Sequence, residues 1–105
     1  MDDTKTKKAI KLIDGIFSAK DGNEILMNLY ASKIAFHQMK NFSSNERFGK
    51  DDETATKRIP ELIESMNLIT SVFQEAMNHN KNLIITSTLT IEFADVIDKM
   101  ACPAQ

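Results

Sequence analysis

Several features that define other protein classes are scarce or missing in this 105-residue sequence. Its single cysteine, Cys102, excludes an internal disulfide framework and a cysteine zinc site, and it favours a reducing compartment. No apolar run approaches the ~20 residues that a membrane span requires. The N-terminus also lacks the apolar centre of a signal peptide. We therefore expect a cytoplasmic protein that does not enter a membrane.

Charge of either sign is not concentrated anywhere along the chain. The formal net charge is −2 at pH 7, and the N-terminal lysines are interspersed with Asp2, Asp3 and Asp14. Nucleic-acid binders usually carry a basic surplus or a basic stripe, so nucleic acid is not the favoured partner. The alternative is an oligomeric regulator whose N-terminal lysines contact phosphates. These lysines are Lys5, Lys7, Lys8 and Lys11.

Motifs that hold phosphates or assemble catalytic sites are also missing. The sequence contains neither G-x-x-x-x-G-K-[ST] nor G-x-G-x-x-G. His37 and His79 lack metal-ligand spacing, which favours a partly buried, hydrogen-bonded His37 and a helix C-terminal His79. The sequence therefore predicts a non-enzymatic protein with no metal and no cofactor. A small-molecule or metal binder that uses His37, Arg47 and nearby acids is a further alternative.

The clearest structural signal is an alternation of residue types over residues 82–94. The odd-numbered positions are apolar, with Ser87 as the interruption, and comprise Leu83, Ile85, Leu89, Ile91 and Phe93. The even-numbered positions comprise Ile84, Thr86, Thr88, Thr90 and Glu92. A period of two predicts one long amphipathic strand. Because the backbone groups of a strand need hydrogen-bond partners, this strand must pair with another.

Residues 8–17 fit either a strand or a helix. Their β-branched residues favour a strand, with Asp14 and Gly15 marking a bend or bulge. The same apolar residues also form a helical stripe, which Gly15 interrupts. Ser18 and Asp21 match a capping box, so a strand that ends at Phe17 leads directly into a helix. We favour the strand, which gives the C-terminal strand a partner within the chain.

Two helices are predicted between the strands. The first spans residues 19 to about 40, and its apolar sector is wide enough to be covered on two sides. The second spans about 52–79 and carries a seam with alternating spacings of three and four residues. The seam comprises Ile59, Leu62, Met66, Ile69, Phe73 and Ala76. Pro60 indicates either that the regular helix starts near Thr56 or that it kinks.

The segment between the helices, residues 41–52, is polar and is predicted to be a loop. Functional residues concentrate on loops that a rigid scaffold holds in place. Phe42, Arg47 and Phe48 are therefore the first candidates for a binding surface, where the arginine could hold an anion or a partner's carboxylate. The alternative is an ordered connector whose arginine pairs with Glu46 or Asp51.

These elements predict an α+β protein of order β-α-α-β, a two-helix hairpin packed on a small antiparallel sheet. The chain forms one domain, with flexible ends at residues 1–7 and 96–105. Two strands under one helical layer are marginal alone, so we expect dimerisation to complete the sheet or the helices. The predicted interface comprises Leu62, Met66, Ile69, Phe73, Leu89 and Ile91. The leading hypothesis is a module that self-associates as a homodimer or higher oligomer and acts through protein contacts, including an unknown protein partner.

Overall fold

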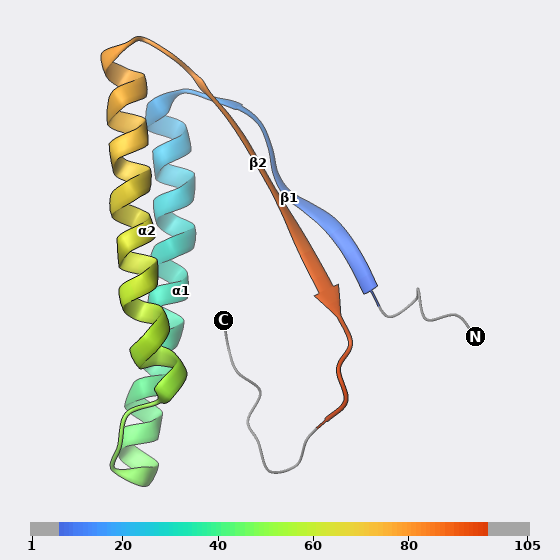
Figure 1. Ribbon diagram of the computed structural model, residues 1–105, viewed down its shortest axis with the longest axis vertical. Helices are drawn as coiled ribbons and strands as arrows, with labels where there is room; N and C mark the ends of the chain where they lie inside the picture. Colours follow the sequence, from blue (N-terminus) through green and yellow to red (C-terminus); the bar gives the residue numbers. More distant parts are fainter. Residues whose placement is uncertain (1–6, 97–105) are drawn as a thin grey trace, which may run out of the picture.

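The computed structural model describes residues 7–96, which form two strands and two helices (Figure 1). The order is β1 (Lys7–Phe17), α1 (Ala19–Phe48), α2 (Glu53–Asn78) and β2 (Leu83–Glu92). The strands pair antiparallel as a ribbon, and the helices lie side by side as a hairpin. The predicted α+β class and β-α-α-β order are confirmed, and the helical alternative for residues 8–17 is wrong. The predicted flexible ends lie outside the described residues except for Lys7, which pairs with Glu92 in the ribbon, and Val96, which is 88% exposed.

The ribbon contains a β-bulge at Leu12. Lys11 lies opposite Thr88 and Ile13 lies opposite Ser87, so Leu12 is the extra residue. On one face of β1 the residues have even numbers up to Leu12 and odd numbers from Ile13 on. The bulge brings both sets to the same face, so that Leu12 and Ile13 line the same hollow beneath α1. The predicted bend at Asp14 and Gly15 is therefore displaced toward the N-terminus, to the place where the parity changes.

The helical hairpin is held together by the predicted seam. Four residues of α2 are buried: Ala55, Leu62, Phe73 and Ala76. Asp52 caps this helix by accepting a 2.9 Å hydrogen bond from the Ala55 amide. Because α2 begins at Glu53, a start near Thr56 is wrong, and Pro60 lies inside the helix. Proline has no N–H, so the carbonyl of Thr56 loses its usual helical donor there.

The predicted loop at residues 41–52 is mostly helical, because α1 continues to Phe48. Gly49 ends the helix in the left-handed conformation, with φ of 69°. Side chains join the end of α1 to the start of α2: Asn45 Nδ2 donates to Asp51 Oδ1 at 3.0 Å, and the Asp52 amide donates to Asn41 Oδ1 at 2.8 Å. These hydrogen bonds offset the weak helix propensity of the polar segment, so the connector shrinks to residues 49–52.

The ribbon joins the hairpin at one end of the molecule and diverges from it toward the other end (Figure 1). The chain is only 14 Å thick, and its radius of gyration is 17.5 Å. A compact domain of this length has a radius of about 13 Å. Six apolar side chains are buried among residues 7–96: Ile13, Ala19, Ala55, Leu62, Phe73 and Ala76. Three of the six are alanines. Residues 7–96 therefore form a small core for a segment of this length.

A cluster of buried residues lies where the ribbon joins the hairpin. Phe73 and Ala76 of α2 meet Ala19 of α1 there, and Leu83 and Ile85 of β2 pack against them. Gly22 of α1 lies so close that an added Cβ would be 2.9 Å from Phe73 Cε1 and 3.0 Å from Ile85 Cδ1. Gly22 is thus the residue that lets the three elements meet.

Candidate interaction surface

The two faces of the ribbon differ in what covers them. Residues directly opposite each other in an antiparallel pair share a face, so the strand register assigns every side chain. We call the face toward the helices the inner face. In β2 it carries Leu83, Ile85, Ser87, Leu89 and Ile91, and in β1 it carries Lys8, Ile10, Leu12, Ile13, Gly15 and Phe17.

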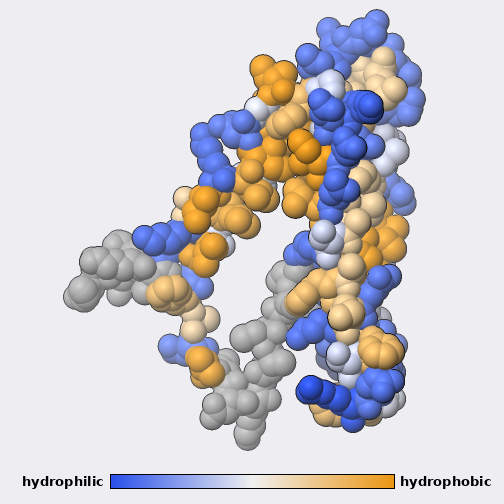
Figure 2. All heavy atoms as spheres, turned by 180° about the vertical axis from the view of Figure 1, so that it is seen from behind, coloured by the Kyte–Doolittle hydropathy of each residue, from blue (hydrophilic) through white to orange (hydrophobic). Residues whose placement is uncertain are grey.

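The inner face is covered by the helices over only part of its length. We call residues 13–17 with 83–87 the closed end of the ribbon, and residues 7–12 with 88–92 the open end. Ile13 of the closed end is 8% exposed, whereas Ile10, Leu89 and Ile91 of the open end are 43–50% exposed. Figure 2 shows hydrophobic side chains gathered where the ribbon meets the hairpin and continuing in patches along the ribbon. An apolar strip thus extends beyond its helical cover.

The helix that faces the ribbon also keeps apolar side chains in solvent. Leu29 of α1 lines the hollow beside Leu12 and is still 39% exposed. Phe36, seven residues further on, lies on the same side of the helix and is also exposed. Lys40 Nζ lies 5.9 Å from the centre of the Phe36 ring. The sequence predicts that the wide apolar sector of this helix is covered on two sides, and within residues 7–96 that cover is incomplete.

The predicted oligomer interface divides into two groups in the structure. Leu62 and Phe73 are buried inside the hairpin, and Met66 and Ile69 are half-buried, so their burial requires no second copy. Leu89 and Ile91 lie on the open end of the inner face and remain exposed. Sequence reasoning missed Ile10 and Leu12, which extend the same strip on β1. The parity change between Leu12 and Ile13 was the available signal, because only a bulge can place both residues on one face.

The predicted loop surface does not converge into a site. Phe42, Arg47 and Phe48 all lie on the last turns of α1, and both phenylalanines are more than 60% exposed. Phe42 and Phe48 are six residues apart, which is about 240° around a helix, so they point in different directions. Asp51, a predicted partner for Arg47, accepts a hydrogen bond from Asn45 instead. The three residues are exposed but do not form an aromatic clamp around the guanidinium.

The two histidines have separate structural positions. His37 is fully buried within α1, with its ring 5.4 Å from that of Phe36 in an edge-to-face arrangement. His79 is the C-terminal cap of α2, and its Nδ1 lies 2.9 Å from the carbonyl oxygen of Glu75. His79 therefore takes the predicted place at the end of a helix. His37 is more deeply buried than the sequence predicts.

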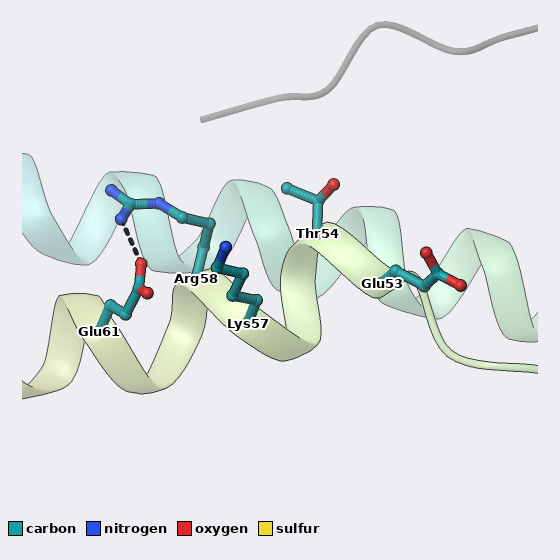
Figure 3. A pocket seen from close by; sticks show the side chains of 5 residues that line it. All are labelled: Glu53, Thr54, Lys57, Arg58 and Glu61. Atoms are coloured by element: carbon teal, nitrogen blue, oxygen red, sulfur yellow. Dashed lines mark hydrogen bonds and ion pairs between the residues drawn. The ribbon is translucent and has the colours of Figure 1, made fainter.

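A charged hollow lies on the first turns of α2 (Figure 3). Its five side chains come from one helical segment: Glu53, Thr54, Lys57, Arg58 and Glu61. Arg58 Nη1 donates to Glu61 Oε1 at 2.6 Å, so the most buried cation already has a carboxylate. Because no second element among residues 7–96 contributes a side chain, these residues form the solvated face of a helix and not a converging site.

The N-terminal lysines and the candidate metal ligands are also not assembled into a site. Lys7 Nζ lies 3.4 Å from Glu92, and Lys11 Nζ lies 3.1 Å from Asp14, so two lysines already face carboxylates. Lys5 and Cys102 lie outside the described residues. Over residues 7–96, no three histidines, cysteines or acids lie close enough to hold a metal ion. This geometry adds nothing in favour of a phosphate or metal site.

Neither helix within residues 7–96 combines the length and the apolar character that a membrane crossing demands. Comparison with protein-family models, curated proteins and solved structures finds no match to this chain. Within residues 7–96, the apolar strip formed by Ile10, Leu89 and Ile91 keeps 43–50% of each side chain in solvent.

Proposed function

We propose that this chain is a small, non-enzymatic, cytoplasmic module that self-associates and acts through protein–protein contacts. The observation that carries the proposal is the open end of the inner face, where Ile10, Leu89 and Ile91 are close to half exposed. A chain that buries three large apolar side chains among residues 7–96 gains little stability from its own core. Burying the open end against protein removes apolar surface from water, at about 25 cal/mol per Å².

The shape of the exposed strip supports protein as the occupant. The strip is long and narrow, and it lies on a ribbon whose outer edges carry no further strand within residues 7–96. A pocket for a small molecule encloses most of its ligand, whereas Ile10, Leu89 and Ile91 lie beyond the hollow that α1 covers and are 43–50% exposed. The lone cysteine supports the reducing location, because extracellular domains of this size often rely on disulfides.

Light scattering coupled to size-exclusion chromatography, over a protein concentration series, tests the proposal. We expect a mass of at least twice 11.8 kDa at tens of micromolar protein. Replacing Leu89 by serine on the open inner face should shift the mass toward the monomer. The matched control is Ile16→Ser, because Ile16 is a 69% exposed residue of the ribbon that lies on the opposite face, in β1. A monomeric wild-type chain with a folded circular-dichroism spectrum would contradict self-association.

A further inference from the structure

The two outer edges of the ribbon differ in charge. The edge formed by β1 carries Lys7, Lys8, Lys11 and Asp14. The edge formed by β2 has no charged residue from Leu83 to Ile91, and Glu92 is its last residue. Proteins commonly protect free strand edges with charged side chains, lysine above all, against pairing with another chain. The edge of β1 is protected in this way, and the edge of β2 is not.

The inner face of β2 has nearly the same pattern in both directions. Its residues are Leu83, Ile85, Ser87, Leu89 and Ile91, with the serine at the centre. If β2 pairs antiparallel with β2 of a second copy about Ser87, Leu89 lies opposite Ile85 of that copy. Ile91 then lies opposite its Leu83. On the outer face the same register places Thr86 opposite Thr88, a favourable cross-strand pair.

This register also solves the problem of the uncovered strip. Leu83 and Ile85 belong to the closed end, where the helices pack on the ribbon. Leu89 and Ile91 belong to the open end. Antiparallel pairing sets the open end of each copy beside the closed end of the other, so the second hairpin stands next to the first copy's exposed strip. The symmetry is closed, which limits the assembly to a dimer at this edge.

We infer that a second copy of this chain pairs with the outer edge of β2, centred on Ser87, to form a four-stranded sheet of order β1-β2-β2-β1. Both hairpins then lie on one face of the sheet. The inference rests on the self-association proposed above and specifies its surface. It accounts for an uncharged edge, for the near-palindromic inner face and for the lysines of β1, which then lie on the outer edges of the dimer.

One substitution can oppose this pairing while sparing the chain's own fold. Thr86 lies on the outer face, directly opposite Asp14 of the same chain. In Thr86→Lys the new lysine gains a carboxylate neighbour within the ribbon. Across the proposed dyad, however, the two new lysines become diagonal neighbours in the sheet, about 7–8 Å apart, and repel each other.

The matched control places a charge on the other edge. Ala9 lies on the outer face of β1, between Lys7 and Lys11 on the same face. In Ala9→Glu the new carboxylate therefore has two lysines as neighbours within its own strand. Sedimentation equilibrium should show that Thr86→Lys raises the dimer dissociation constant by at least about tenfold. Ala9→Glu should leave it within about twofold, because β1 is remote from the dyad. Circular dichroism establishes that both variants are folded.

A distance measured within the dimer tests the same pairing without relying on the folding of Thr86→Lys. Nitroxide labels at Thr90→Cys, in a Cys102→Ser background, lie six residues apart along the paired strands, which is about 20 Å between backbones. Pulsed electron paramagnetic resonance should give one short distance distribution near this value. A dimer whose labels are more than about 40 Å apart, or one unaffected by Thr86→Lys, overturns the β2 edge but keeps self-association. A monomeric wild type overturns both.

Discussion

The two ends of the ribbon share their strands, their alternation and their apolar character, yet they differ in what they contact. At the closed end, Ile85 packs against Phe73 and lies near Gly22. At the open end, Ile91 lies on the same face six residues further along β2 and is 47% exposed. The residue types are alike, so the helices alone make the difference. An apolar strand face therefore does not by itself tell which part of it the helices of the same chain cover.

The largest expected effect is at the closed end. Replacing Phe73 by alanine removes a 5% exposed ring from the place where three elements meet. We expect a loss of about 3–5 kcal/mol in the free energy of unfolding, from lost transfer energy and the cavity left behind. Urea denaturation followed by circular dichroism at one fixed protein concentration measures the loss, because association makes stability depend on concentration.

Leu68→Ala is the matched control for that measurement. Leu68 lies on the same helix and is 66% exposed. Substitution there should change stability by no more than about 0.5 kcal/mol. Comparable losses at the two positions would show that Phe73 does not hold the closed end together.

The second prediction concerns two glycines with opposite expected signs. Alanine is favoured over glycine in a helix by about 1 kcal/mol, but at Gly22 its Cβ would lie 2.9 Å from the Phe73 ring. Overpacking costs about 1–3 kcal/mol, so Gly22→Ala should be destabilising by about 1 kcal/mol net. In Gly15→Ala the nearest side-chain atom is 3.4 Å away, and the change should be neutral or stabilising. Thermal denaturation of both variants compares them, and a stabilised Gly22→Ala would show that the three elements can move apart.

The sequence predicts the elements of both ends because local signals specify them. A period of two marks β2, and Ser18 marks the start of α1, where its Oγ accepts a 3.1 Å hydrogen bond from the Asp21 amide. The prediction of a loop at residues 41–52 is wrong for a different reason. Residues 41–48 of this segment are helical, and the Asp52 amide donates a hydrogen bond to Asn41 Oδ1. These two residues are 11 apart, and no local propensity encodes such a contact.

The candidate surface was predictable only in part. Leu62 and Leu89 are both apolar residues in regular patterns, and each was a reasonable interface residue. Leu62 is 3% exposed in the hairpin, whereas Leu89 is 43% exposed on the ribbon. A helical seam has the same spacing within one chain as between two chains, so the pattern cannot distinguish them. The distinction appears only when the ribbon's path away from the hairpin is known.

The smallest expected effect is at Ile91, and it is measured by making one change at both ends of β2. Ile85→Thr introduces a hydroxyl where the side chain packs on the core, and should lower the free energy of unfolding by about 1–2 kcal/mol. Ile91→Thr alters a half-exposed side chain beyond the helices. At protein concentrations low enough to favour the monomer, it should change stability by less than about 0.5 kcal/mol. Denaturation at low and high concentration separates the two roles. Ile91→Thr should become destabilising only where the chain associates, and an equal effect at both concentrations would mean that the open end is already packed within one chain.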